Sequence, residues 1–261
     1  MKPYWSNEEL GLYIYNEDCI DAMDDLSDNI ADITLTSPPY NMNLRIRNGK
    51  YCSRQIVKEL TTKYSSFPDN LSMDDYFRFS YEVVNRCLRI APILFYNIQF
   101  LTGNKRALYR LIGEFSDDIK EFIVWDKVNS QPAIGEGVLN SQWEAILVFD
   151  KENAISRKFD GEFDRGELSN LWSIKRGKKP TKCHGAVYPV ELVEMVVGNF
   201  SSKSGVVFDP FLGTGSTMVG CSMLGRGCIG IEIDEKYCEV AVNRVEKEIK
   251  KQRNTGVRLW N

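Results

Sequence analysis

The stretch GVVFDPFLGTGST, residues 205–217, runs from an apolar segment through a glycine-rich turn into the start of a helix. Val206–Phe208 is typical of a buried strand, and the pattern after the turn predicts a helix that ends at Gly225, a residue suited to a left-handed C-cap. Gly213 and Gly215 allow the backbone to approach a ligand closely, and the helix N-terminus offers free N–H groups to an anionic or carboxylate group. The segment therefore predicts a strand–turn–helix unit with a ligand at its turn.

Six further runs of β-branched and aromatic residues occur along the chain, and together with residues 206–208 they predict about seven strands. Helical patterns separate them: Ser72 with Asp75 is a capping signal before one helix, and Pro189 stands at the first helical position of another. This alternation predicts an α/β fold with a mainly parallel, seven-stranded sheet. The six runs are Leu12–Tyr15, Ile30–Leu35, Ile90–Ile98, Glu121–Trp125, Trp143–Phe149 and Cys228–Ile233.

Two stretches interrupt this alternation. Residues 41–71 are polar, basic and long for a loop, which indicates a functional or mobile segment. Residues 151–184 are interpreted as a small insertion over the active edge of the sheet, and as the candidate target-recognition segment. The expected organisation is a catalytic domain made of residues 1–150 and 185–250, with residues 251–261 as a C-terminal tail.

The composition excludes several classes of protein. Hydrophobic residues make up 43% of the 261-residue chain, yet no apolar run approaches the ~20 residues that span a bilayer. The first residues are polar and acidic and do not resemble a signal or transit peptide, so we expect a soluble, cytoplasmic protein. Seven cysteines without a Cys-x-x-Cys pair indicate reduced thiols. Because His184 is the single histidine, we expect no structural metal.

Charge is distributed unevenly, although the net charge is only −3. The first 32 residues are strongly acidic, whereas two polar segments carry clusters of lysine and arginine. Two interpretations are open: one face meets DNA phosphates while the rest of the surface repels them, or both clusters are solvated loops. The candidate DNA-binding residues are Arg45, Arg47, Lys50 and Arg54 in the first cluster, and Lys175, Arg176, Lys178, Lys179 and Lys182 in the second.

A second motif, Thr36-Ser-Pro-Pro-Tyr40, follows the strand predicted at Ile30–Leu35. Its two prolines fix φ at about −65° and remove two backbone donors, so they hold Ser37 and Tyr40 stiffly at the end of the strand. A hydroxyl, two carbonyls and an aromatic ring on one turn suit an exocyclic amino group that donates hydrogens while its ring stacks on the tyrosine. A Pro-Pro turn after a buried strand is the alternative, and the motif alone does not decide between them.

The glycine turn discriminates between cofactors. A dinucleotide-binding turn has a third glycine where this chain has Met218, so a pyrophosphate cofactor is disfavoured. Glu232 ends the next predicted strand, where a carboxylate can accept hydrogen bonds from both hydroxyls of a ribose; a surface acid at a strand end is the alternative. Asp18 follows the first predicted strand, and it suits a helix N-cap, a hydrogen bond from an adenine amino group, or both.

Both motifs resemble those of DNA amino-methyltransferases. The Ser-Pro-Pro-Tyr segment is similar to the catalytic motif of this family, and Asp-Pro-Phe-x-Gly-x-Gly-Ser is similar to its S-adenosylmethionine-binding motif. The resemblance implies S-adenosyl-L-methionine as cofactor, double-stranded DNA as partner, and an intracellular enzyme of prokaryotic or phage type. The site residues that it implies are Ser37, Pro38, Pro39 and Tyr40 for catalysis, and Asp18, Asp209, Pro210, Phe211, Gly213, Thr214, Gly215, Ser216 and Glu232 for cofactor binding.

Three further segments are similar to the family. The segment His184–Pro189 resembles the one that leads into the first helix near the methionine end of the cofactor, although Gly185 stands where the family usually has proline. A capping histidine would equally explain His184. Trp125-Asp126-Lys127 and Trp143-Glu144 fall where the family carries similar residues, and packing in the core and at the sheet edge suffices to explain them.

The order of the motifs adds independent information. In the usual nucleotide-binding layout the glycine turn follows the first strand, but here it lies about 170 residues after the Ser-Pro-Pro-Tyr motif. The sheet is therefore expected in circularly permuted order, and this arrangement resembles the β group of amino-methyltransferases. The resemblance extends over residues 11–50 and 70–250, and it implies a Rossmann-like methyltransferase fold with small insertions.

The positions of the cysteines limit the reactions that this chain can catalyse. None of the cysteines follows a proline, which excludes the covalent mechanism of cytosine C5-methyltransferases. Direct in-line attack by an amino nitrogen on the sulfonium methyl remains, with hydrogen bonds from that amino group to Ser37 Oγ and to the Pro38 carbonyl. Serine at position 37 resembles the N4-cytosine branch, so methylation of a flipped cytosine at N4 is favoured, and N6-methylation of adenine stays as the alternative.

Two more distant functions remain open. Methyltransferases of RNA or of protein amides use related Pro-Pro-Tyr turns, but those families usually place the glycine motif first. An inactive nucleic-acid-binding module is the non-enzymatic alternative, and the intact Ser37, Tyr40, Asp209, Gly213 and Glu232 argue against it. The sequence leaves open the target site, a cognate restriction endonuclease and a homodimer, and it indicates no membrane partner.

Overall fold

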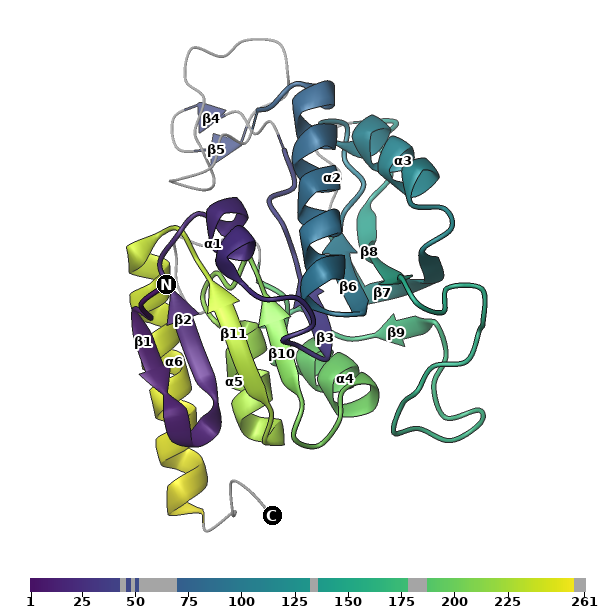
Figure 1. Cartoon of the computed structure of the whole chain (residues 1–261). Helices are drawn as coiled ribbons and strands as arrows, with labels where there is room; N and C mark the ends of the chain where they lie inside the picture. Colours follow the sequence, from purple (N-terminus) through teal and green to yellow (C-terminus); the bar gives the residue numbers. More distant parts are fainter. Residues whose placement is uncertain (43–45, 48–49, 52–69, 132–135, 178–186, 256–261) are drawn as a thin grey trace.

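A nine-stranded sheet forms the centre of the molecule, with helices on both of its faces (Figure 1). The computed structural model describes residues 1–42, 46–47, 50–51, 70–131, 136–177 and 187–255. The strands of this sheet are β1 (Trp5–Asn7), β2 (Leu12–Tyr15), β3 (Ile33–Thr36), β6 (Ile93–Ile98), β7 (Ile119–Gln131), β8 (Ser141–Asp150), β9 (Leu171–Ser173), β10 (Val206–Asp209) and β11 (Gly227–Ile231). The helices are η1 (Glu8–Leu10), α1 (Cys19–Asp25), α2 (Met73–Ile90), α3 (Lys105–Glu114), α4 (Val190–Phe200), α5 (Ser216–Leu224) and α6 (Glu235–Asn254). A second, two-stranded sheet consists of β4 (Ile46–Arg47) and β5 (Lys50–Tyr51).

The order of strands across the large sheet is β1-β2-β11-β10-β3-β6-β8-β7-β9. Strands β2, β11, β10, β3 and β6 are parallel, whereas β8 lies antiparallel between β6 and β7. All seven predicted strands are present, and the predicted α/β fold in circularly permuted order is confirmed, because β10 pairs with β3 from the other end of the chain. Two short strands, β1 and β9, extend the sheet beyond that number. Runs of three residues are too short to show the periodicity that identifies a strand.

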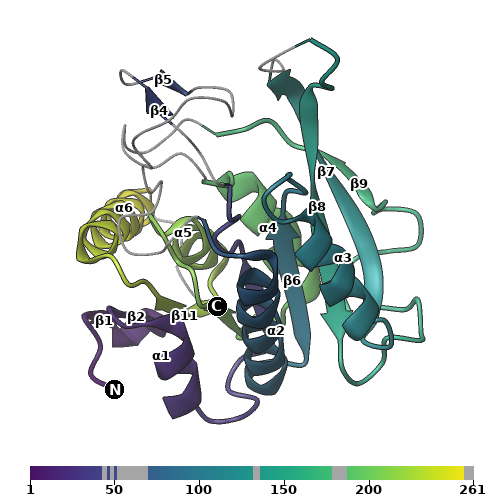
Figure 2. The same cartoon turned by 90° about the horizontal axis from the view of Figure 1, so that it is seen from above.

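Helices α1, α2 and α3 cover one face of the sheet, and α4, α5 and α6 cover the other (Figures 1 and 2). Each layer encloses its own apolar core. In β8, Leu147 belongs to the core beneath α2 and Val148 to the core beneath α4, as the alternation of side chains along a strand requires. Because both faces are covered, the central strands are nearly continuous apolar runs in the sequence.

Helix ends follow the capping signals of the sequence. Ser72 caps α2, since its Oγ accepts a hydrogen bond from the backbone N–H of Asp75 at 3.1 Å. Gly225 ends α5 in the left-handed conformation, with a φ of 70°. Pro189 is the N-cap of α4 and not its first helical residue as predicted. Proline fits either position, because neither needs its N–H for a bond inside the helix.

Two parts of the expected domain organisation join the main fold. Residues 171–173, from the segment interpreted as an insertion, form β9 and pair with β7 at the edge of the sheet. Helix α6 continues to Asn254, so the first residues of the expected C-terminal tail are helical, and Gln252 is buried. Most of the basic segment 41–71 lies outside the described residues.

The described part of the chain carries no helix that is both long and apolar enough to cross a membrane. Across the same residues, no three His, Cys, Asp or Glu side chains are grouped in a way that could hold a metal ion. The cysteines that the structure describes are buried free thiols: Cys19, Cys87, Cys221, Cys228 and Cys238.

Helices α4 and α5 approach each other closely at Gly220. A Cβ atom at this position would lie 2.5 Å from Val193 Cγ1 and 2.8 Å from Val193 Cβ, and rotation of the valine does not move its Cβ. We expect Gly220→Ala to lower the free energy of unfolding by ~1–3 kcal/mol, because the two helices must separate.

The matched control is Gly198→Ala in α4, where nothing lies within 4 Å of an added Cβ. Alanine should raise the free energy of unfolding there by ~0.5–1 kcal/mol, through its higher helix propensity. Urea denaturation measures both variants, and a Gly220→Ala protein as stable as the control would contradict the close packing.

Candidate active site

The two sequence motifs meet at the carboxyl edge of the parallel strands. Strand β3 leads into Ser37, and its neighbour β10 leads into the glycine turn. On the other side of β10, strand β11 leads into Glu232 and its neighbour β2 leads towards Asp18. The carboxyl ends of parallel strands share one edge of a sheet, and open α/β sheets bind their ligands at this edge.

The buried carboxylate of Asp209 joins the two motifs. Its Oδ1 accepts hydrogen bonds from Thr36 Oγ1 at 2.8 Å and from the backbone N–H of Phe211 at 3.0 Å. Its Oδ2 accepts hydrogen bonds from Tyr188 OH at 3.0 Å and from Thr217 Oγ1. Asp209 is 0% exposed, and burial raises its pKa to about 6. Through these four donors Asp209 positions the glycine turn, and the cofactor-binding role that the sequence assigns to it stays a prediction.

The glycine turn has the conformation that its two glycines permit. Gly213 and Gly215 have φ values of 54° and 83°, in the left-handed region. A Cβ atom at Gly215 would lie 2.8 Å from Ala241 Cβ, so α6 leaves no room for a side chain there. The turn therefore presents bare backbone at the start of α5, where the helix N–H groups are free to bind a carboxylate.

Arg244 of α6 holds the same turn from one side. Its guanidinium donates hydrogen bonds to Thr214 Oγ1 at 3.1 Å and to Ser216 Oγ at 3.4 Å. Thr214, Ser216 and Pro210 are buried, and Phe211 is partly buried. No sequence pattern marks Arg244, because its contacts depend on how α6 packs against the turn.

Glu232 receives two backbone hydrogen bonds at the end of β11. Its Oε2 accepts from the N–H of Gly213 and its Oε1 from the N–H of Asp234, both at 2.8 Å. Burial raises the pKa of Glu232 to about 7, and the two hydrogen bonds act in the opposite direction. Each carboxylate oxygen can accept one further hydrogen bond, so a pair of ribose hydroxyls fits this position.

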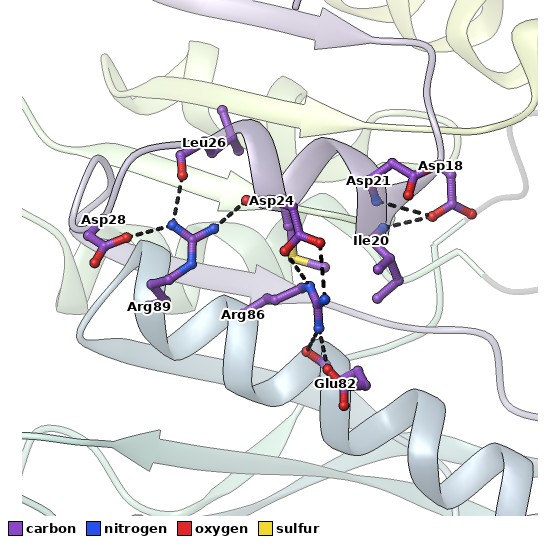
Figure 3. A network of polar contacts seen from close by, with 10 residues as sticks. Asp18, Ile20, Asp21, Asp24, Leu26, Asp28, Glu82, Arg86 and Arg89 are labelled. Atoms are coloured by element: carbon purple, nitrogen blue, oxygen red, sulfur yellow. Dashed lines mark hydrogen bonds and ion pairs between the residues drawn. The ribbon is translucent and has the colours of Figure 1, made fainter.

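Asp18 caps helix α1 at the same edge of the sheet (Figure 3). Its Oδ1 accepts a hydrogen bond from the N–H of Ile20 at 2.8 Å, and its side chain is exposed. Arg86 and Arg89 of α2 bind acidic side chains and backbone carbonyls near the C-terminal end of α1, as Figure 3 shows. The N-cap interpretation is confirmed, and an adenine contact by the same side chain stays a prediction.

Hydrogen bonds to backbone carbonyls fix the Pro-Pro-Tyr turn. Tyr76 OH donates to the Pro39 carbonyl at 2.8 Å, and Asn104 Nδ2 donates to the Tyr40 carbonyl at 2.7 Å. The next residue, Asn41, has a φ of 51° and is buried. The turn is thus held by α2 and by the N-cap of α3, in addition to the stiffness of its prolines.

A buried polar cluster lies against this turn. Ser37 Oγ is 2.9 Å from Tyr40 OH, and Tyr40 OH donates a hydrogen bond to Glu144 Oε2 at 2.8 Å. Asn97 Nδ2 donates to Tyr40 OH at 2.9 Å and to Glu144 Oε2 at 3.1 Å. Lys127 Nζ donates to Glu144 Oε1 at 3.2 Å, and burial lowers the pKa of this lysine. Tyr40 is 4% exposed, so its ring is not an open platform for a stacked base.

Packing sufficed to explain Lys127 and Glu144 from the sequence, but in the structure both side chains belong to this polar cluster. Each of the three polar side chains behind the turn continues one apolar face of its strand, which is a signal that the sequence did contain. The patterns are Phe95-x-Asn97 in β6, Ile123-x-Trp125-x-Lys127 in β7 and Glu144-x-Ile146 in β8. A polar residue at the first or last position of an apolar alternation is therefore a candidate site residue when that end of the strand lies at the carboxyl edge of the sheet.

Few of the predicted DNA-binding residues have described side chains. Lys175 and Arg176 follow β9 and are exposed, and Arg176 Nη2 lies 4.0 Å from Glu144 Oε1. Of the described residues in the second basic cluster, Arg176 thus reaches the polar cluster. The side chains of Arg45, Arg47, Lys50, Arg54, Lys178, Lys179 and Lys182, and the whole of His184, lie outside the described residues.

The chain is similar in sequence to known DNA methyltransferases. A family model described as DNA methylase, covering N6 and N4 enzymes, matches residues 31–243. The type II methyltransferase M.MthZI of Methanothermobacter thermautotrophicus is 27% identical, with 92% of this chain and 78% of that protein covered. The type II methyltransferase M2.MboI of Moraxella bovis is 22% identical over 94% of this chain and 91% of its own length.

Solved structures share the fold at low sequence identity. PvuII DNA methyltransferase, a cytosine-N4-specific enzyme, has a TM-score of 0.67 at 15% identity and covers 92% of this chain and 90% of its own. The complex of M1.HpyAVI with S-adenosylmethionine has a TM-score of 0.59 at 18% identity and covers 89% of this chain and 98% of its own.

Tyr76→Phe tests the anchoring of the turn. The change removes the hydroxyl that donates to the Pro39 carbonyl and leaves a buried acceptor without this partner. We expect the free energy of unfolding to fall by ~1–3 kcal/mol. Tyr81→Phe, on the same helix, is the control, since among the described residues the Tyr81 hydroxyl makes no hydrogen bond. Thermal or urea unfolding measures both variants, and equal free energies of unfolding would contradict a stabilising role of the Tyr76 hydroxyl.

Proposed function

Since this chain belongs to the N6/N4 family of DNA methylases, we propose that it transfers a methyl group from S-adenosylmethionine to N4 of cytosine in double-stranded DNA. One observation carries the proposal. The hydrogen bond from Thr36 to Asp209 sets Ser37, on the Pro-Pro turn, beside a glycine turn that suits the methionine carboxylate. Ser37, which can accept a hydrogen bond from an amino group, and the turn that would bind the methyl donor thus follow adjacent strands of the sheet.

The residues at the carboxyl edge fit the cofactor. Glu232 accepts hydrogen bonds from the ribose hydroxyls. The turn at Gly213 and Gly215, together with the N-terminus of α5, binds the methionine end of the cofactor. Asp18 accepts a hydrogen bond from the adenine amino group. Two structural neighbours, M1.HpyAVI and TTHA0409 of Thermus thermophilus, were solved with S-adenosylmethionine, which supports this assignment.

The chain's own residues supply orientation and polarisation. When bound, the cofactor provides an electrophilic sulfonium methyl group. Ser37 Oγ and the Pro38 carbonyl accept hydrogen bonds from the two N–H groups of the flipped cytosine, which returns electron density to the nitrogen and aligns it with the methyl group. The hydrogen bonds of Tyr76 and Asn104 to the turn keep these acceptors in place.

Serine at position 37 supports cytosine over adenine, and so does the fold shared with a cytosine-N4-specific enzyme. The similarity to type II methyltransferases supports a role beside a restriction endonuclease that recognises the same site. The two basic segments of the sequence are the parts of the chain that we assign to the DNA phosphates.

The product identifies the reaction. Purified protein with labelled S-adenosylmethionine and unmethylated genomic DNA should yield N4-methylcytosine in nucleoside digests analysed by mass spectrometry. Ser37→Ala should slow the reaction on the order of 100-fold, because one of the two amino-group acceptors is lost. A digest that contains N6-methyladenine and lacks N4-methylcytosine would assign the chain to adenine.

Cofactor affinity should depend on the protonation of Glu232. Its pKa of about 7 lies above the ordinary value, so the carboxyl group becomes protonated as the pH falls below neutrality. Proton and ribose compete for the same oxygens, and the Kd of S-adenosylmethionine should therefore rise roughly tenfold between pH 8 and pH 6.

Isothermal titration of the cofactor over this pH range measures the effect. Glu232→Gln should bind more weakly at pH 8 and show a flat pH profile, because its amide does not titrate. Glu235→Gln, at the start of α6, is the control and should keep the slope of the original protein. A wild-type affinity that is constant from pH 6 to pH 8 would contradict the ribose assignment.

A further inference from the structure

The hydroxyl hydrogen bonds in the polar cluster behind the Pro-Pro-Tyr turn all run in one donor-to-acceptor direction. Glu144 Oε2 has no hydrogen to give as a carboxylate, so the hydroxyl hydrogen of Tyr40 points at Glu144 across their 2.8 Å contact. That hydroxyl has a single hydrogen, and the 2.9 Å contact between Ser37 and Tyr40 must therefore use the hydrogen of Ser37. The hydroxyl bonds run from Ser37 to Tyr40 to Glu144.

Asn97 supports this direction. Its Nδ2 lies 2.9 Å from Tyr40 OH, 3.1 Å from Glu144 Oε2 and 3.4 Å from Ser37 Oγ. The nitrogen must face the cluster, because the amide oxygen would repel the carboxylate. With its own hydrogen directed at Tyr40, Ser37 Oγ keeps lone pairs for incoming donors, and one of these remains beside the long contact from Asn97.

Glu144 is held by charged groups from two other elements. Lys127 of β7 donates to Oε1 at 3.2 Å, and Arg176, after β9, lies 4.0 Å from the same atom. Lys127 is 1% exposed and Glu144 is 8% exposed. Burying this pair costs free energy that a pair of apolar side chains would not cost, so stability alone gives no reason for it.

The backbone next to Lys127 is strained in a way that serves the cluster. Val128 has a φ of 65°, a conformation that β-branched residues rarely adopt. The pairing of β7 with β8 shifts register between Asp126 and Gln131, and such bulges redirect side chains next to active sites. Backbone strain at this position indicates a functional demand on the direction of Lys127.

We propose that Ser37, Tyr40 and Glu144 form a proton relay that carries away the amino proton released by methyl transfer. The inference rests on the proposed function, since it needs an amino group at Ser37. Glu144 acts through Tyr40 and is a positioning residue: it sets the direction of both hydroxyl bonds and holds the proton at the end of the chain. Lys127 orients Glu144 and compensates its charge.

The step balances in atoms and electrons. The lone pair of the amino nitrogen forms the new N–C bond, and the S–C bond breaks with its electron pair left on sulfur. The nitrogen, now positively charged, gives its proton to Ser37 Oγ. Ser37 passes its own proton to the oxygen of Tyr40, and Tyr40 passes its proton to Glu144 Oε2, which becomes neutral. No other reactant is required.

Single-turnover methylation as a function of pH tests the relay. The substrate is unmethylated duplex DNA, and S-adenosylmethionine is saturating. The relay ends on a carboxylate, so a rate that depends on the relay should fall at acidic pH. Glu144→Gln and Tyr40→Phe should each slow the reaction on the order of 100-fold and lose this acid limb, while the Kd of S-adenosylmethionine stays within twofold of wild type.

A third variant separates the relay from a structural role. Lys127→Met with Glu144→Gln removes both charges, so its thermal unfolding should approach that of the original protein more closely than Glu144→Gln does, while its rate stays low. Glu152→Gln, an exposed carboxylate after β8, should keep both the rate and the acid limb.

Three results would overturn the relay. In the first, Tyr40→Phe and Glu144→Gln keep both the wild-type rate and its fall at acidic pH. In the second, the double variant recovers the wild-type rate. In the third, the rate of the wild-type protein does not fall at acidic pH. The identity of the methylated base is read separately from the digests. A product of N6-methyladenine would overturn the choice of cytosine and leave the relay test intact, whereas absence of any methylation by the wild-type chain would overturn both.

Discussion

The carboxylate of Asp209 accepts hydrogen bonds from Thr36, Phe211, Tyr188 and Thr217, which come from three parts of the chain: the end of β3, the segment before α4, and the stretch 205–217 itself. An uncompensated charge in this buried position would be very costly, so the four donors and the carboxylate must be present together. Their arrangement sets the distance between the Pro-Pro turn and the glycine turn. The carboxyl edge of the sheet works as one site because this single buried group ties both of its halves.

The remainder of the site is built on rigid elements. Tyr76 and Asn104 hold the carbonyls of the Pro-Pro-Tyr turn, and Ala241 excludes any side chain from Gly215. The polar cluster around Glu144 adds buried charge and a strained residue at Val128. These features lower stability, and they are concentrated at the edge where the proposed chemistry takes place. The opposite layers of apolar core, beneath α2 and beneath α4, offset that cost.

Local patterns predicted most of the fold. The apolar runs identified seven strands, the Ser72 and Gly225 caps appear as expected, and the order of the two motifs predicted the permuted sheet. The edge strands β1 and β9 were missed because three residues carry no periodicity. The contacts of the Asp209 carboxylate with Thr36 and Tyr188 were not predicted, since a sequence motif shows which residues are close along the chain and does not show which way a side chain points.

By itself, the sequence determined the α/β class, the two turns and the residues on them, because proline and glycine act on the backbone locally. Only the tertiary structure decided that Glu144 lies against the Pro-Pro-Tyr turn. Strand β8 runs antiparallel between β6 and β7, and for that reason its beginning, and not its end, lies at the carboxyl edge beside Ser37 and Tyr40. The direction of a strand relative to its neighbours is a property of the assembled sheet, and no pattern within the strand encodes it.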